Sequence, residues 1–156
     1  MTTTTTPQSK VATISLTDAS VAQRLHAAAE SLADLVSELA LISEHSERWY
    51  RLKDFLDEMQ AGADKKEVTP EELTGWAVAL TFAAVEARIH AVEPNVFFLV
   101  RSYGEACLLA AHCREEQDAG RDTEESLSQF NAAIDFILDG VPEIEIPQAT
   151  IWKKAA

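Results

Sequence analysis

The sequence predicts an all-α bundle of four to five helices built around a central apolar helical hairpin. Apolar residues recur at helical spacing through most of the chain, capping residues stand at the junctions, and two long apolar segments are separated only by a short turn. At 156 residues, 47% of them apolar, the chain is most simply one domain with a substantial core. We expect residues 1–14 to form a disordered threonine-rich tail, residues 15–140 the bundle, and residues 141–156 an extended tail packed on it.

The first apolar pattern is a heptad seam, in which steps of four and three alternate through Val21, Leu25, Ala28, Leu32, Leu35, Leu39 and Ile42. After an extra step of three, the seam continues through His45, Trp49, Leu52, Leu56 and Met59. The extra step fits one long bent helix and two consecutive helices equally well. Ser15 or Thr17 is the expected N-cap of the first helix.

The central hairpin is expected between Trp76 and Cys113. Its first helix begins with a capping box, in which Thr69 is the N-cap, Pro70 the first helical residue and Glu72 the reciprocal partner. This helix is apolar on two faces, so we expect it to pack on two sides. One face consists of Val78, Phe82, Val85, Ile89 and Val92, and the other of Leu73, Trp76, Ala77, Leu80, Ala84, Ala87 and Ala91.

The second hairpin helix is predicted to follow a turn at residues 92–95, with Asn95 as its cap. It is apolar almost all round, except for a narrow stripe of Arg101, Glu105 and His112. Each hairpin segment is long enough to span a bilayer, but charged residues interrupt both. We therefore expect a soluble core rather than a membrane pair, with an ion pair between Arg101 and Glu105.

The last helix is expected after an exposed acidic loop at residues 114–125, which holds six carboxylates against two arginines around Gly120. Asp122 and Glu125 have the spacing of a second capping box. The helix is amphipathic through Leu127, Phe130, Ile134, Ile137 and Leu138 and is predicted to stop at Gly140 before Pro142.

The charge balance of 26 acidic against 13 basic residues gives a net charge of −13. This charge argues against direct binding of nucleic acid or of an anionic membrane and favours a basic protein surface as the partner. Cys107 and Cys113 are six residues apart, roughly 9 Å along one helix, which is too far for a disulfide. Two reduced thiols and the absence of a signal peptide indicate a cytoplasmic protein.

The charged surface of the heptad-seam segment changes along its length. Its second half carries opposite charges four apart, which neutralise one another: Glu44–Arg48, Glu47–Arg51 and Lys53–Asp57. Its first half carries Glu30, Asp34 and Glu38, with no lysine or arginine three or four positions away. We predict that this stripe binds a partner, together with Glu115, Glu116 and Asp118. The alternative is an acidic surface that serves only solubility.

Signals for chemistry are weak. Glu86, His90, Glu105 and His112 are the best metal candidates, but bundle sites favour Glu-x-x-His spacing and this chain has Glu-x-x-x-His without a second copy. We therefore expect no metal and no cofactor. Two carboxylate pairs, Glu44-x-x-Glu47 and Glu115-x-x-Asp118, are similar to the magnesium-binding pairs of all-α nucleotide pyrophosphatases.

The sequence thus favours a non-catalytic acidic protein-binding module, an inhibitor or regulator that engages a basic, nucleic-acid-binding surface of a partner protein. The alternatives are an all-α metal-dependent enzyme such as a nucleotide pyrophosphatase and a structural homo-oligomeric subunit. A homodimer is expected, because the heptad seam and the two-faced hairpin offer more apolar surface than one small bundle covers.

Overall fold

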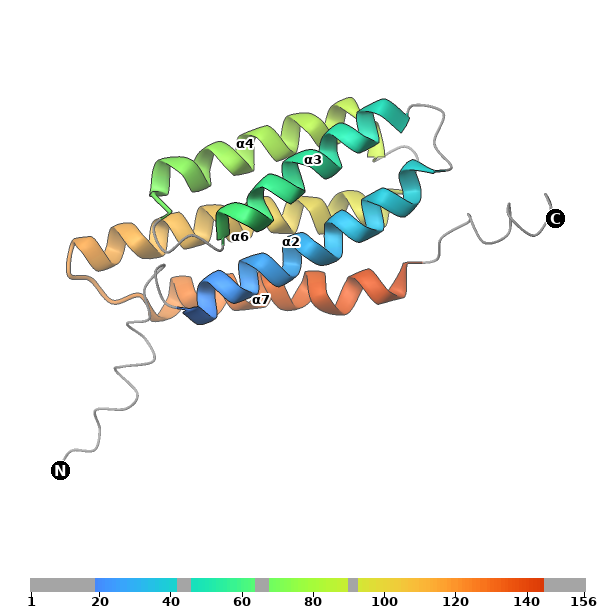
Figure 1. Ribbon diagram of the computed structural model, residues 1–156. Coiled ribbons are helices and arrows are strands. Elements are labelled where there is room, and N and C mark those ends of the chain that lie inside the picture. The colour runs from blue at the N-terminus through green and yellow to red at the C-terminus, as the bar shows by residue number, and fades with distance from the viewer. Residues whose placement is uncertain (1–18, 42–45, 64–67, 90–92, 145–156) are drawn as a thin grey trace.

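Helices account for nearly all of the residues that the structure describes, which are 19–41, 46–63, 68–89 and 93–144 of the chain in a computed structural model (Figure 1). The elements are α2 (Ala19–Ala40), α3 (Ser46–Ala63), α4 (Pro70–Glu86), α6 (Pro94–Asp118), α7 (Glu124–Gly140) and a 3-10 turn, η1 (Val141–Glu143). The prediction of an all-α bundle is confirmed.

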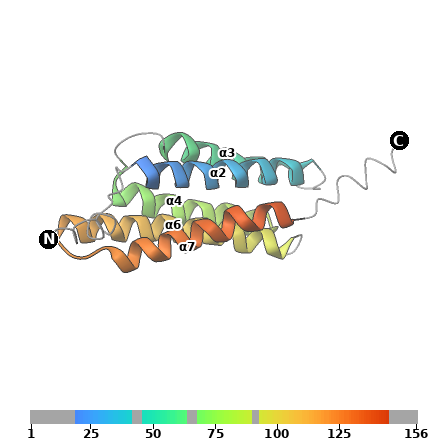
Figure 2. The same ribbon diagram turned by 90° about the horizontal axis from the view of Figure 1, so that it is seen from below.

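The helices form two layers, and the view from below shows α2 and α3 on one side of α4, α6 and α7 (Figure 2). In one layer α2 packs against α3, and in the other α6 lies between α4 and α7. Successive helices run in opposite directions, and α2 also contacts α6 and α7, while α3 contacts α4. The hairpin of α4 and α6 is therefore central, as predicted, because α6 touches three other helices.

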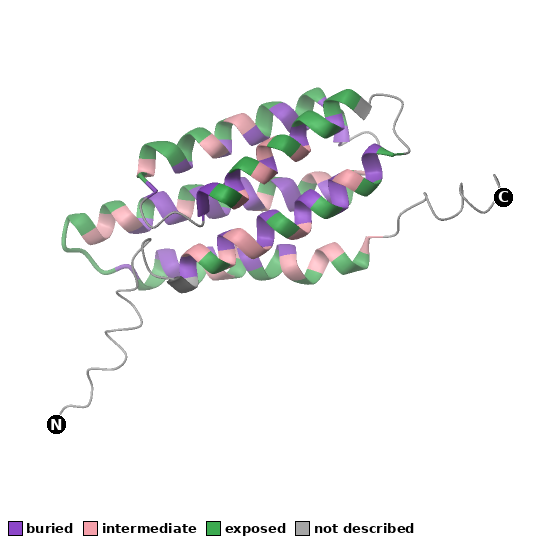
Figure 3. Cartoon of the chain, in the orientation of Figure 1, coloured by how far each residue is buried: buried purple, intermediate pink, exposed green. Residues whose placement is uncertain are grey.

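The heptad seam forms two consecutive helices rather than one. α2 ends at Ala40 and α3 begins at Ser46. The seam residues that are described lie buried on both helices: Val21, Leu25, Ala28, Leu32, Leu35, Leu39, Trp49, Leu52, Leu56 and Met59. Each helix accordingly shows a buried stripe beside an exposed one (Figure 3). Ser15, Thr17, Ile42 and His45 lie outside the described residues.

The start of α4 has the predicted capping box, in which the Glu72 amide donates to Thr69 Oγ1 at 3.1 Å and the Thr69 amide donates to Glu72 Oε1 at 3.0 Å. The helix ends earlier than its apolar pattern predicts. α4 stops at Glu86, because Arg88 adopts a left-handed conformation with φ of 58° that a right-handed helix excludes. The prediction that Asn95 caps the next helix is also wrong, since Pro94 occupies the first helical position and Glu93 precedes it as N-cap.

The prediction that α4 packs on two sides is wrong for one of its two apolar faces. Leu73, Ala77, Leu80 and Ala84 are buried against the bundle. Val78, Phe82 and Val85 are instead 52%, 73% and 51% exposed. The layer of α4, α6 and α7 is the outermost layer on this side, so the second face of α4 meets no other described part of the chain.

The predicted acidic loop is partly helical, because α6 continues through Arg114 to Asp118. α7 then begins after Thr123, whose side chain makes no capping hydrogen bond. Asp122 does not form the expected capping box; its Oδ1 accepts a hydrogen bond from the Glu124 amide at 3.1 Å. Cys107 and Cys113 are both buried on α6 and are not joined in a disulfide.

α7 covers the core along the side of α6 and α2, and its Leu127, Phe130, Ile134 and Ile137 are buried. Val141 and Ile144, at and just after η1, are partly buried against the same core. The segments 1–14 and 145–156 lie outside the described residues, so the predicted N-terminal tail and most of the C-terminal tail stay predictions.

Candidate partner-binding surface

The acidic stripe of α2 lies on the exposed side of the α2–α3 layer, since Glu30, Asp34 and Glu38 are all exposed. Contacts between the two helices fix which α3 residues lie beside the stripe. Gln60 Nε2 lies 3.3 Å from His26 Nε2, and the charge of Asp34 reaches Lys53. Because the helices are antiparallel, Asp57 lies near the level of Glu30, and the stripe is flanked by the acidic middle of α3.

Lys53 is the basic residue of α3 that lies among the carboxylates of the stripe and of α3. Its ammonium donates to Asp57 Oδ2 at 2.6 Å. This hydrogen bond and the charges of Asp57, Asp54 and Asp34 raise the pKa of Lys53 above its ordinary value, although partial burial works in the opposite direction. Three carboxylates thus act on one ammonium, so the surface remains negative around its own cation.

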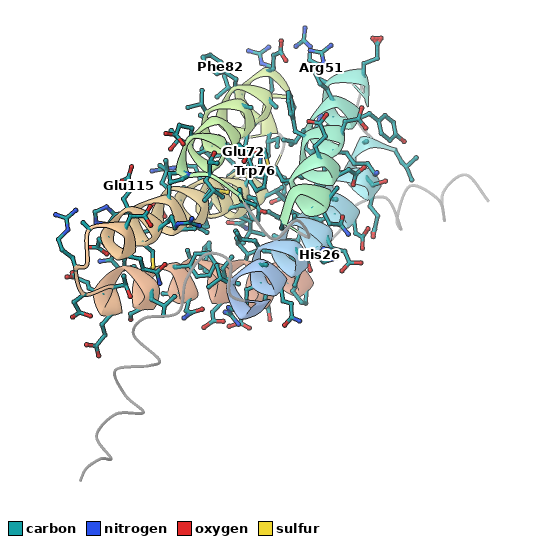
Figure 4. All side chains as sticks on the ribbon, turned by 60° about the vertical axis from the view of Figure 1, so that its left-hand side comes forward. His26, Arg51, Glu72, Trp76, Phe82 and Glu115 are labelled. Carbon is teal, nitrogen blue, oxygen red and sulfur yellow. The ribbon has the colours of Figure 1, made fainter. Side chains whose placement is uncertain are left out.

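The two arginines of α3 are directed toward α4 instead of the acidic stripe. Arg51 Nη1 donates to Glu86 Oε1 at 2.9 Å, and Arg48 Nη1 donates to the Glu86 carbonyl oxygen at 3.3 Å. Figure 4 shows Arg51 at the outer end of α3, close to the end of α4. The predicted Glu47–Arg51 pair is therefore replaced by a contact between layers, and only Lys53–Asp57 forms as predicted; Glu44 lies outside the described residues.

The second group of predicted partner-binding residues lies at the end of α6. Glu116 is half-buried, accepts a hydrogen bond from Ser126 Oγ at 2.7 Å, and lies 3.3 Å from His112 Nε2. Asp118 accepts from Arg114 Nε at 3.4 Å. Glu115 is exposed and points into solvent (Figure 4). Two of these three carboxylates therefore contact neighbouring side chains, and Glu116 joins α6 to α7 through Ser126.

The structure does not bring the two acidic groups together. Tyr103 Oη donates to the Leu25 carbonyl oxygen at 3.1 Å, which aligns the antiparallel helices α2 and α6. From this alignment Glu30 and Glu115 are roughly 25 Å apart along the bundle axis. A single small contact would not span both groups. We call Glu30, Asp34 and Glu38 of α2, together with Asp54 and Asp57 of α3, the α2–α3 surface. This surface is the better candidate, because three of its carboxylates act on the one ammonium of Lys53.

The weak metal candidates also lie apart. Glu86 is bound by Arg51 at the end of α4, whereas Glu105 and His112 are seven residues apart on α6, roughly 10 Å along its axis. His90 lies outside the described residues. Among the residues that are described, no three His, Cys, Asp or Glu side chains gather closely enough to hold a metal ion.

The two carboxylate pairs that resemble a pyrophosphatase site occupy opposite ends of the bundle. Glu47 is in the first turn of α3, at the end where α4 finishes, and Glu115 and Asp118 are in the last turns of α6 at the other end (Figure 1). Since α6 alone is roughly 37 Å long, these pairs do not share one ion.

The predicted ion pair between Arg101 and Glu105 is not formed. Both residues are exposed on the outer side of α6, and no described residue forms a salt bridge with either. Their charges lie among exposed apolar side chains that the sequence pattern assigns to the core.

The apolar pattern of α4 is visible in the sequence, but nothing in this pattern distinguishes a helix face that the same chain covers from a face that stays exposed.

One described helix, α6, is long and apolar enough to cross a membrane by length and composition, with a mean hydropathy of 1.2 over its most apolar window. Within that window, 56% of the residues are buried inside the bundle. The cytoplasmic location stays a prediction.

Comparison with protein-family models, with curated proteins and with solved structures finds no significant match to this chain.

Proposed function

We propose that this protein is a non-catalytic binding module whose α2–α3 surface engages a basic surface of a partner protein. The observation that carries the proposal is the environment of Lys53. Asp34, Asp54 and Asp57 act on it together, while Arg48 and Arg51 of the same helix are directed to Glu86. Around Lys53 the surface thus presents three carboxylates to one ammonium.

A basic partner would relieve the repulsion between these carboxylates. Glu30, Asp34 and Glu38 stand one helical turn apart, and like charges at this spacing destabilise a helix by a few tenths of a kcal/mol per pair. Successive carboxylates repeat about every 6 Å along α2. One DNA strand presents a phosphate about every 3.4 Å. The stripe therefore supports electrostatic attraction of a nucleic-acid-binding protein better than close imitation of duplex DNA, and such attraction raises association rates more than affinity.

The proposal is tested by capturing partners from the native cell with wild type and with two variants of equal charge. One variant neutralises the stripe, Glu30→Gln/Asp34→Asn/Glu38→Gln. The other, Glu71→Gln/Asp139→Asn/Glu143→Gln, neutralises three exposed carboxylates elsewhere. Both raise the net charge from −13 to −10.

We expect a basic protein to be retained by wild type and by the second variant, to be lost by the stripe variant, and to elute as salt rises. Circular dichroism checks that both variants stay folded. If a folded stripe variant keeps every partner, or if no partner is captured at low salt, the proposal is wrong.

A further inference from the structure

The outer face of the α4–α6–α7 layer is an apolar surface that no described part of the chain covers. Six of the eight large apolar side chains that are exposed in the described residues lie on it. They are Val78, Phe82 and Val85 on α4, Phe98 and Leu108 on α6, and Phe136 on α7. Figure 4 shows Phe82 pointing away from the bundle, on the side of α4 opposite α3. We call these six residues the outer apolar face.

The outer apolar face is continuous across the three helices. One open groove runs between α4 and α6, and a second runs between α6 and α7. Leu108 lines both grooves and so joins them. With exposed fractions of 47% to 73%, the six side chains present roughly 500 Å² of apolar surface. Two copies packed face to face would bury roughly 1,000 Å² from these side chains alone, which reaches the size of a specific interface before its polar rim is added.

The exposed residues along the outer side of α6 follow a spacing that is the same from either end of the helix. These residues are Pro94, Phe98, Arg101, Glu105, Leu108 and His112, separated by steps of four, three, four, three and four. The pattern is centred on Tyr103. When two such helices pack antiparallel about that centre, Arg101 of each lies opposite Glu105 of the other, and Phe98 lies opposite Leu108. This is a seam of heptad spacing that is complementary to itself in charge and in polarity.

The helices on either side of α6, α4 and α7, each place an exposed apolar side chain level with Tyr103, the centre of the α6 pattern. Gly104 lies beside Ala77, since a Cβ added at Gly104 would be 3.9 Å from the Ala77 Cα, so the next residue of α4, Val78, is level with Tyr103. Gly140 lies against Leu99, so Phe136, one turn earlier on α7, is level with Tyr103 as well. A residue on a two-fold axis meets its own copy, and an apolar side chain does so without repulsion.

We propose that two copies of this chain associate through the outer apolar face, with their α6 helices antiparallel and the two-fold axis at the level of Tyr103. Arg101 and Glu105 then form two equivalent ion pairs between the copies, and Val78 and Phe136 each pack against themselves. The proposal is independent of the proposed function, since the α2–α3 surface lies on the opposite layer and faces outward in the dimer.

The decisive experiment exchanges the two charges. Sedimentation velocity at micromolar concentration is expected to give twice the 17.1 kDa chain mass for wild type. Arg101→Glu places two carboxylates opposite one another, and Glu105→Arg places two arginines opposite one another, so each single variant is expected to shift toward monomer, with dimer affinity at least about tenfold weaker. The double exchange Arg101→Glu/Glu105→Arg restores both pairs and the dimer.

Mixing the two single variants provides the sharpest readout. Each is weakened alone, but together they form a heterodimer in which every charge at positions 101 and 105 meets its opposite. Leu108→Asp is expected to abolish the dimer. Leu41→Asp changes a leucine just after α2 that is 58% exposed, against 47% for Leu108, and is expected to leave the dimer intact.

The proposal is overturned if wild type sediments as a monomer up to submillimolar concentration, and wild-type binding to phosphatidylcholine vesicles would then identify a lipid surface as the occupant. It is also overturned if the dimer survives Leu108→Asp, or if the mixture of the two single variants stays as weakly associated as each alone. Circular dichroism confirms that each variant retains its helices.

Discussion

Two glycines in helices should respond to alanine with opposite signs, and the reason lies in what each one faces. Gly62 packs under Trp76: a Cβ added there would lie 2.6 Å from Trp76 Cζ2 and 2.9 Å from Cη2, closer than carbon atoms approach. A Cβ added at Gly75 would meet nothing within 4 Å. Figure 4 shows Trp76 on the side of α4 that faces α3. The packing of α4 against α3 therefore depends on the absence of a side chain at Gly62.

Alanine favours a helix over glycine by roughly 0.5–1 kcal/mol. At Gly75 nothing opposes this gain, so Gly75→Ala should stabilise the protein by about that amount. At Gly62 the overlap forces the indole to move, and overpacking typically costs about 1–3 kcal/mol. Gly62→Ala should therefore destabilise by about 1–2 kcal/mol after the helix gain is subtracted, which corresponds to a melting temperature lower by about 2–8 °C.

Urea denaturation of wild type and both variants at one fixed protein concentration measures the two signs. Trp76→Leu supplies the internal control, because removing the indole should make Gly62→Ala neutral or stabilising in that background. If Gly62→Ala stabilises the protein as much as Gly75→Ala does, the packing of Trp76 on α3 is wrong.

Three further predictions concern single groups. Thr69→Ala removes the capping box of α4 and should lower the free energy of unfolding by about 1 kcal/mol in urea denaturation; an unchanged midpoint would contradict the cap. Tyr103→Phe removes the buried hydrogen bond to the Leu25 carbonyl and should lower it by about 1 kcal/mol, with no change in helix content. Burial raises the pKa of the Cys107 thiol and of the Tyr103 hydroxyl above their ordinary values of 9.0 and 10.0, so the unfolded chain loses these protons first. The stability that these two protonated groups contribute is thus fully present below those pH values. Above them the free energy of unfolding declines by up to about 1.4 kcal/mol per pH unit for each group. Urea denaturation from about pH 8 to about pH 11 should show this decline, and a curve that Cys107→Ala does not flatten would refute it.

The sequence is sufficient to predict the helices, because their apolar spacing and the capping box at Thr69 act locally. The break at Arg88 is not predictable in this way, since no glycine or proline marks a left-handed residue there. The prediction of a loop after Arg114 is wrong because composition does not report that α7 packs against this last stretch of α6.

The candidate surfaces depend still more on tertiary packing. The acidity of the α2 stripe follows from spacing, but the direction of Arg48 and Arg51 toward Glu86 is set by how α3 lies on α4. The apolar face of α4 is recognisable as a pattern, yet its assignment to the core is wrong, because apolar spacing is the same whether this chain or another molecule covers it.

The central claim is that the α2–α3 surface, rather than net charge alone, binds cationic partners. Its most direct test is titration of a lysine-rich peptide into three proteins: wild type, Glu30→Gln/Asp34→Asn/Glu38→Gln, and the equally charged Glu71→Gln/Asp139→Asn/Glu143→Gln. We predict that the stripe variant binds about tenfold more weakly than wild type, while the second variant stays within about twofold of it. Equal weakening of both variants would show that only the overall charge matters and would contradict the claim.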